Sequence, residues 1–142
     1  MKKWFVFLFL LVGLGDLYAQ PVPDTSIVTT VDTYPQFRGG VRGWHRFVQQ
    51  NLNVRDLLND LDSTSYVDYG LRQTAVMEFT VCEDGRVCDV EIANKNKISP
   101  AFAEEALRVM KKSPKWTPAK KDGQGVRTRF KQSITALLEQ SN

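Results

Sequence analysis

The sequence is poor in the residues that most enzymes use for catalysis. Its 142 residues include a single histidine, His45, and two cysteines, Cys82 and Cys88. A catalytic triad or a histidine-based zinc site needs partners at set geometry, and none is apparent, so His45 is interpreted as a surface or packing residue beside Trp44. The sequence also lacks a phosphate-binding glycine loop and a nucleophile elbow. We therefore expect neither an enzyme nor a protein that holds a metal or a cofactor.

A large excess of charge of one sign is also missing. The chain has 19 lysines and arginines against 16 aspartates and glutamates, and its formal net charge is +3. A nucleic-acid-binding protein would show a concentrated basic patch, so we expect no nucleic-acid partner. We also expect no small-molecule substrate, because the sequence shows no catalytic motif. Glu104 and Glu105 are not expected to form an acid–base pair, because adjacent helical positions point to different sides. They are interpreted as charges that complement a helix dipole.

No apolar run is long enough for a confident membrane span. The run of residues 4–14 is apolar apart from a glycine and is followed by Asp16, whereas a span needs about 20 apolar residues. Lys2 and Lys3 precede the run, and the small-residue site Leu17-Tyr18-Ala19 follows it. This layout is typical of a signal peptide that is cut after Ala19, and an uncleaved membrane anchor is the rival interpretation. We expect export, and therefore an environment in which disulfides form.

The rest of the chain has room for one domain. Prolines and threonines mark residues 20–33 as a linker or a loosely held first strand, and residues 34–140 are expected to form the domain. Apolar residues at steps of three and four predict a helix through Trp44 and Leu52. Asn53 is expected to cap a second short helix, and the polar stretch that follows it through Gly70 is interpreted as a loop.

Three strands and a third helix complete the expected pattern. Residues 74–81 alternate between apolar and polar, which predicts a strand with one core face. Residues 87–92 form the next strand, and a three-residue gap between apolar positions indicates a β-bulge near Cys88 and Asp89. A helix begins at Ser99-Pro100 and ends before Ser113-Pro114. A turn over residues 122–125 leads into a long final strand, residues 126–138.

This order predicts an α+β fold. The hairpin makes the first two strands antiparallel, and the helix that follows returns the chain to the far side of the first strand. The result is a three-stranded antiparallel sheet in the order second-first-third, with the helices packed on one face. The final strand then lies at an edge, where one row of its backbone N–H and C=O groups is unpaired.

The two cysteines lie in the hairpin, and the register of the hairpin constrains them. A two-residue loop would put Cys82 and Cys88 on opposite faces. A three-residue loop, residues 83–85, pairs Val81 with Val87 and keeps the apolar faces together, so it is preferred. Both cysteines are then diagonal neighbours on the outer face, about 7–8 Å apart. That spacing is long for a disulfide unless the bulge shortens it, so a bridge and two free thiols both remain open. The spacing fits neither a zinc site nor a C-x-x-C redox pair.

Three stretches resemble a known family. They are YPQFRGG at residues 34–40, FTVCEDGRVCDVEI at residues 79–92, and EEALRVMKKSPKWTPAKKDGQGVRTRF at residues 104–130. They are similar to the C-terminal domain of TonB in the form common among Bacteroidetes. The resemblance covers about Tyr34 to Leu138, and the block around Trp116 and Pro118 is its most specific part.

The resemblance implies a periplasmic domain that binds a partner protein. The family's domain binds a short extended segment, the TonB box, of an outer-membrane TonB-dependent transporter, and this segment adds as a strand to the edge of the sheet. An exposed final strand suits this mode, because strand addition uses main-chain groups. The expected partner-binding residues are Val126, Arg127, Thr128, Arg129, Phe130, Lys131 and Gln132.

The chain also departs from the family. It shows no convincing anchor and almost no spacer, and Val54-Arg55 stands where the family has a Tyr-Pro pair. We therefore expect a transporter or another envelope protein as the partner, with a homodimer, a regulator of transport and an envelope thiol enzyme as alternatives. The basic residues Arg127, Arg129 and Lys131 are expected either to meet an acidic partner or phospholipid headgroups, or to form a solvated strand face.

Overall fold

The computed structural model describes residues 25–60 and 62–139. The signal peptide predicted over residues 1–19 therefore lies outside the described residues, as does the start of the segment 20–33. Within the described part of the chain, no helix has the length and apolar character to cross a membrane.

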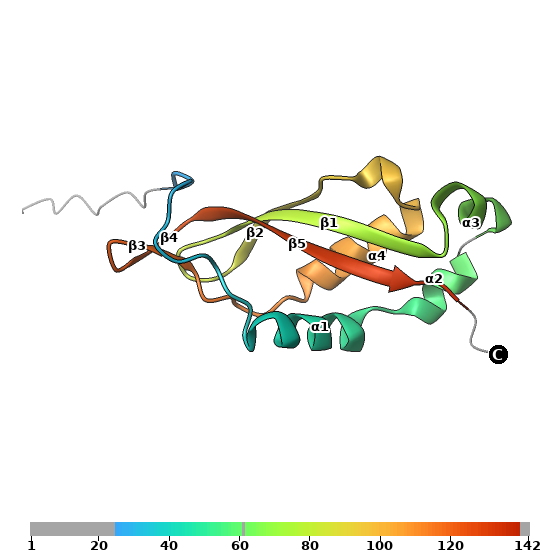
Figure 1. The fold of residues 1–142 in the computed structure, drawn as a ribbon, viewed down its shortest axis with the longest axis horizontal. Coiled ribbons are helices and arrows are strands. Elements are labelled where there is room, and N and C mark those ends of the chain that lie inside the picture. Colours follow the sequence, from blue (N-terminus) through green and yellow to red (C-terminus); the bar gives the residue numbers. More distant parts are fainter. Residues whose placement is uncertain (1–24, 61, 140–142) are drawn as a thin grey trace, which may run out of the picture.

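Three strands form the central sheet in the order β2-β1-β5 (Figure 1). They are β1 (Arg72–Val81), β2 (Val87–Ile92) and β5 (Thr128–Leu137), and β1 pairs antiparallel with both neighbours. This arrangement confirms the predicted fold class and strand order. It places β5 at an edge of the sheet.

Alternation along β1 decides which face of the sheet is buried. Ala75, Met77, Phe79 and Val81 are 0% exposed, because successive side chains of a strand point to opposite faces. Two of their partners on β5, Phe130 and Ile134, continue the same apolar face. The helices pack on this face.

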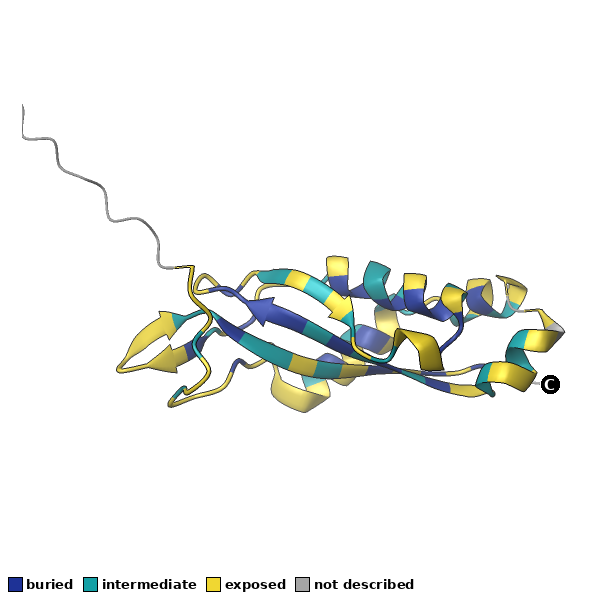
Figure 2. Cartoon of the chain, turned by 90° about the horizontal axis from the view of Figure 1, so that it is seen from above, coloured by how far each residue is buried: buried dark blue, intermediate teal, exposed yellow. Residues whose placement is uncertain are grey.

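The two long helices, α1 (Gly40–Asn51) and α4 (Pro100–Lys111), cover the core face of the sheet. The Ser99 hydroxyl accepts the backbone N–H of Phe102, and a proline occupies the first turn, so α4 begins where the sequence predicts. In Figure 2 the helix beside the sheet has its exposed residues on the side away from the strands and its buried residues on the side that faces them. Trp44 is the most buried residue of α1, and Figure 1 shows this helix running alongside β5.

Two shorter helices follow α1. Asn53 accepts the backbone N–H of Asp56 at 3.2 Å and so caps α2 (Val54–Asp60), as predicted. The prediction of a loop after α2 is wrong, because the chain forms α3 (Ser63–Tyr69) there. The polar composition of α3 hides it from a search for apolar periodicity, but Asp62 caps it by accepting the backbone N–H of Ser65 at 2.8 Å. The 3-10 helix η1 (Lys95–Lys97) lies between β2 and α4.

The β1–β2 hairpin has the preferred register. Val81 pairs with Val87, which confirms the three-residue loop. Gly85 has a φ of 85°, and a Cβ there would lie 2.1 Å from the carbonyl oxygen of Trp116, so only glycine fits this turn. The predicted bulge is also confirmed, because β2 carries one extra residue beside Asp89, whose φ is 50°.

The prediction of one long final strand is wrong at its start. The chain first forms a small second sheet from β3 (Ala119–Lys121) and β4 (Gln124–Val126). Its turn consists of Asp122 and Gly123 alone, both with positive φ, as a two-residue hairpin turn requires. The edge strand β5 of the central sheet therefore begins only at Thr128.

The described part of the N-terminal segment, residues 25–36, runs beside this second sheet. Thr33 forms an isolated antiparallel bridge with Lys120, and Gln36 forms another with Thr117. The segment thus contacts the domain at defined positions and passes close to the start of β5 (Figure 1).

Candidate partner-binding edge

Two contacts flank a stretch of the outer edge of β5. The indole N–H of Trp44 donates a hydrogen bond of 3.0 Å to the carbonyl of Ser133. The backbone N–H of Val28 donates a bond of 2.8 Å to the carbonyl of Arg127. Both acceptors point away from β1, so the odd-numbered residues between them also turn their backbone groups outward.

Two residues leave this edge open. The outward backbone groups of Arg129 and Lys131 have no hydrogen-bond partner among residues 25–60 and 62–139. Since the backbone of Phe130 points inward to β1, the N–H and C=O groups of Arg129 and Lys131 lie in one row along the open edge. Such a row is a template for another strand.

Only some of the seven predicted partner-binding residues lie on the open edge of β5. Val126 belongs to β4 and pairs with Ala119 rather than with a free edge. Arg127 is contacted by Val28, and the hydroxyl of Thr128 donates a bond of 2.7 Å to the carbonyl of the same valine. The open edge is therefore shorter than the sequence predicted, and Arg129, Phe130, Lys131 and Gln132 remain as its candidates.

A hollow of about 220 Å³ lies between this edge and α1. Most of its wall is apolar and includes Val41, Trp44 and Phe130, and Gln132 contributes a polar group. A strand added to β5 would turn alternate side chains toward this hollow. The edge thus combines main-chain groups that any peptide can use with a recess that selects a side chain.

The basic side chains of β5 are neutralised within the chain. Arg129 donates a hydrogen bond of 2.9 Å to the carbonyl of Asp89 and forms ion pairs with Glu78 and Glu91. Lys131 also lies 3.4 Å from a carboxylate oxygen of Glu78. The stripe that the sequence suggested for an acidic partner therefore already has acidic neighbours on β1 and β2.

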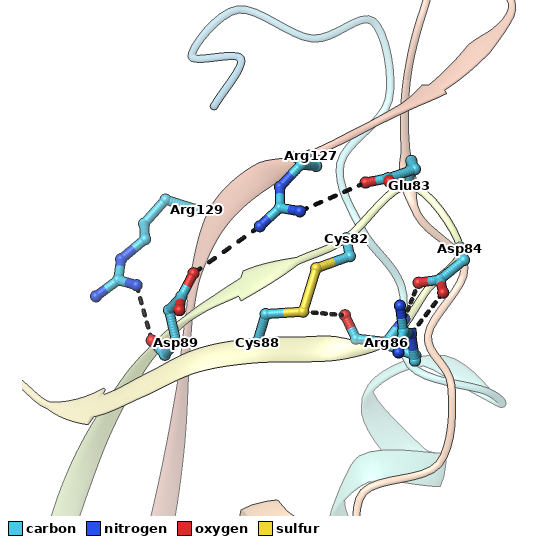
Figure 3. The surroundings of a disulfide bond; sticks show 8 residues. All are labelled: Cys82, Glu83, Asp84, Arg86, Cys88, Asp89, Arg127 and Arg129. Atoms are coloured by element: carbon cyan, nitrogen blue, oxygen red, sulfur yellow. Dashed lines mark hydrogen bonds and ion pairs between the residues drawn. A yellow bond between two sulfur atoms is a disulfide. The ribbon is translucent and has the colours of Figure 1, made fainter. Parts of the chain in front are cut away.

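Arg127 has the same kind of surroundings. Figure 3 shows its guanidinium between Glu83 and Asp89, at 3.9 and 4.0 Å. The buried Nε of Arg127 and the buried hydroxyl of Thr80 have no hydrogen-bond partner in the described part of the chain. The side chain of Arg127 is thus partly buried by residues of the hairpin on the outer face of the sheet.

The two cysteines lie beneath these charges. In the structure Cys82 and Cys88 form a disulfide, and their Cα atoms are 6.6 Å apart (Figure 3). This separation falls within the range of about 4.4–6.8 Å that disulfides span. Cys82 is 2% exposed but does not belong to the hydrophobic core. The bridge therefore ties the two strands of the hairpin on the outer side of the sheet.

The remaining candidate residues are structural. His45 is exposed, whereas Trp44 and Trp116 are 2% and 4% exposed and belong to an aromatic cluster of the core. The indole N–H of Trp116 donates to the hydroxyl of Ser113 at 2.9 Å. Across residues 25–60 and 62–139, no group of three or more histidines, cysteines, aspartates or glutamates is placed to hold a metal ion.

Glu105 also has a structural role. Burial raises the pKa of its carboxyl, but the side chain of Arg108 and the backbone N–H of Asn53 donate hydrogen bonds that outweigh burial and hold the pKa below its usual value. The carboxylate joins α4 to the start of α2. The contact thus connects two elements of the fold.

Among residues 25–60 and 62–139, three arginines without an acidic partner lie on α1 and just before it. Arg38, Arg42 and Arg46 line a separate hollow of about 600 Å³ together with Phe37 and Phe47. The interpretation of the sequence missed this group. The spacing of Arg42 and Arg46 places these two on one face of a helix, but Arg38 lies outside the helix and is not revealed by it.

A comparison with protein-family models finds one match to residues 69–135, the model described as Gram-negative bacterial TonB protein C-terminal. This range contains the central sheet to Thr135, α4 and the β3–β4 hairpin, and begins after α1 and α2. Searches of curated proteins and of solved structures found no match.

Proposed function

Because residues 69–135 belong to the TonB C-terminal domain family, we propose that the chain captures an extended peptide of a TonB-dependent transporter by strand addition to β5. The family's domain is periplasmic and non-enzymatic, and it acts in energy transduction through TonB-dependent outer-membrane transporters. Another envelope protein with an exposed extended segment would be bound in the same way.

The open backbone groups of Arg129 and Lys131 are the observation that carries the proposal. Each new backbone hydrogen bond contributes a net of about 0.5–1.5 kcal/mol, so a few bonds alone give weak binding. The hollow beside Val41 and Phe130 offers an apolar contact in addition. Together these features suit a short segment that binds and leaves quickly, as a transient interface does.

We also propose how the rest of the chain is organised. Residues 1–19 are a signal peptide that is removed on export, residues 20–33 connect it to the domain, and residues 34–140 are the domain. The positive start, apolar run and small-residue site support the first point. N-terminal sequencing of the protein recovered from the periplasm checks it, and a mature chain that still begins at Met1 contradicts it.

Replacing Lys131 by proline tests strand addition directly. Proline lacks the outward N–H but spares the ladder with β1, whose groups come from the neighbouring residues. The ligand is a synthetic peptide that contains the TonB box of a transporter from the same cell, and affinity is measured by calorimetry. We expect Lys131→Pro to weaken binding by about tenfold, the loss expected for one hydrogen bond. Lys131→Ala, which keeps the N–H, is the matched control and should bind within about twofold of the parent.

Unchanged binding by folded Lys131→Pro protein would rule out pairing at this edge. Hydrogen exchange gives a second readout that needs no variant. The amide of Lys131 should exchange fast in the free protein and slowly in the complex, while the amide of Phe130 should be protected in both. Protection of Lys131 in a dimer without peptide would instead show that the edge pairs with a second copy.

A further inference from the structure

Three arginines on one side of α1 surround a hollow. Arg38, Arg42 and Arg46 line it, and Pro114 closes it from the segment after α4. This side of α1 differs from the side that faces β5, where Trp44 and Val48 are buried. The hollow is therefore a second surface, separate from the strand edge.

A close backbone approach holds Arg38 beside the helix. The carbonyl oxygen of Arg38 would lie 2.1 Å from a Cβ at position 43, so the fold-back of the chain depends on Gly43. Gly39, with a φ of 82°, makes the bend between them. The structure thus brings an arginine from outside the helix to the same hollow as Arg42.

The floor of the hollow is apolar. Phe37 is 8% exposed, and its ring centroid lies 5.3 Å from that of Phe47. Together with Pro114 these rings form a surface that side chains can cover. With a volume of about 600 Å³, the hollow has room for more than a single small anion.

The positive charges around this floor have no partners. Among the described residues, no carboxylate forms an ion pair or a hydrogen bond with Arg38, Arg42 or Arg46. No acidic residue lines the hollow either. Guanidinium groups bind carboxylates in a fixed planar geometry, so this surface favours an anionic partner.

We infer that this hollow is a docking site for an acidic peptide segment of an envelope protein, in addition to the proposed strand edge. One helical turn of four residues separates Arg42 from Arg46, which is about 6 Å along the axis. In an extended peptide, residues two apart are about 6.6–6.8 Å apart and share a face. Acidic residues at every second position therefore meet successive arginines.

The same geometry favours a peptide over other anions. A phosphate group is too small to reach the whole row of arginines, whereas an extended peptide carries carboxylates at the spacing of the row and lays its backbone over the aromatic floor. A second copy offers acidic residues on α2 and in the turn before α3, such as Asp56, Asp60 and Asp62. Those carboxylates lie on a short helix or in a helix cap rather than in an extended segment, so they match the arginine row less well.

The test uses the full mature protein and a labelled peptide that alternates aspartate with valine. Fluorescence anisotropy measures binding to the parent and to the triple variant Arg38→Gln, Arg42→Gln, Arg46→Gln. We expect the triple variant to bind about tenfold more weakly, since three exposed ion pairs are lost. A peptide with asparagine in place of aspartate should bind the parent as weakly as the aspartate peptide binds the triple variant.

A second triple variant, Arg72→Gln, Lys95→Gln, Lys97→Gln, is the matched control. It removes three exposed positive charges away from the hollow and should change affinity by less than about twofold. Equal weakening by both triple variants would show general charge attraction and overturn the inference. Circular dichroism checks that each variant is folded.

Other occupants give distinct results that also overturn the inference. Arginine-dependent binding of inorganic phosphate or phosphatidylglycerol vesicles, without binding of the acidic peptide, would assign the hollow to phosphate groups. Arginine-dependent dimers in light scattering would assign it to a second copy. Lys131→Pro separates the two surfaces, because it should leave binding of the acidic peptide unchanged while weakening the transporter peptide.

Discussion

Two groups of arginines show how differently the fold treats the same side chain. Arg127 and Arg129, beside the start of β5 and on it, have carboxylates from the hairpin within 4 Å. Arg42 and Arg46 on α1 have none among the described residues. In the sequence both groups read as basic residues on a solvent-facing side.

The difference follows from the neighbours that each element has. A strand in a sheet has cross-strand neighbours at fixed positions, about 4.5–5.5 Å away between Cβ atoms. Here Glu78 lies directly opposite Lys131 and diagonally from Arg129. Glu91 lies opposite Glu78 on the next strand, within reach of the long side chain of Arg129. The outer side of a helix has no such neighbours, and its charge stays available for a partner.

Replacing Gly43 by alanine should change the free energy of unfolding more than any other variant, and it affects only the surroundings of α1. Alanine is the better helix former by about 1 kcal/mol, so local propensity alone predicts a gain in stability. The clash with the carbonyl of Arg38 predicts instead a loss of about 2–3 kcal/mol. Urea denaturation decides between them, and a stabilised Gly43→Ala protein would show that Arg38 is not held against the helix.

Gly40→Ala is the matched control for this clash. Gly40 also has a positive φ, 62°, but no atom lies within 4 Å of the position of its Cβ. Its replacement should cost about 1 kcal/mol from backbone strain alone. The difference between the two variants isolates the close approach of the chain.

The disulfide stabilises the hairpin that supplies the carboxylates near Arg127. A thiol count on the unreduced, purified protein should find no free thiol, and two free thiols would exclude the bridge. If Cys82 and Cys88 are both replaced by alanine, we expect a loss of about 2 kcal/mol, as for a short closed loop. The looser hairpin would then hold Glu83 and Asp89 less firmly near Arg127. Gly43→Ala and the double cysteine variant should be additive, because the two sites share no contact.

The smallest expected changes in stability come from replacing one arginine of each group by methionine. Arg129→Met leaves Glu78 and Glu91 directly opposite each other without their common partner, and should cost about 1–2 kcal/mol. Arg42→Met should change stability by less than about 0.5 kcal/mol, because it removes no contact with a carboxylate. Urea midpoints at low and high salt measure both, and the gap should narrow as salt screens the charges. Equal costs would mean that the two groups have similar surroundings.

Much of the fold could be predicted because it is encoded locally. The alternation along residues 74–81 fixes the buried face of β1, and one three-residue gap reveals the bulge at Asp89. The helix α3 was missed because capping by Asp62, not apolar periodicity, marks it. The second sheet was missed because both Val126 and the residues of β5 continue one alternating pattern, which does not show where the pairing partner changes.

The candidate sites could be predicted less completely. The free edge at Lys131 followed from the strand order, but its limits did not. They depend on Val28 and Trp44, which contact residues about ninety positions or more away along the chain. The hollow on α1 needed the fold-back of Arg38 on Gly43, for which no residue pattern is diagnostic.

The sequence by itself determined the three strands of the central sheet apart from the start of β5, their order, the hairpin register and the resemblance to the TonB domain, because periodicity and turn chemistry act over a few residues. Only the tertiary structure decided which charges are paired and how much of β5 stays open. Those properties depend on contacts between distant segments. Glu91 meets Arg129 and Trp44 meets Ser133 only once the chain has folded.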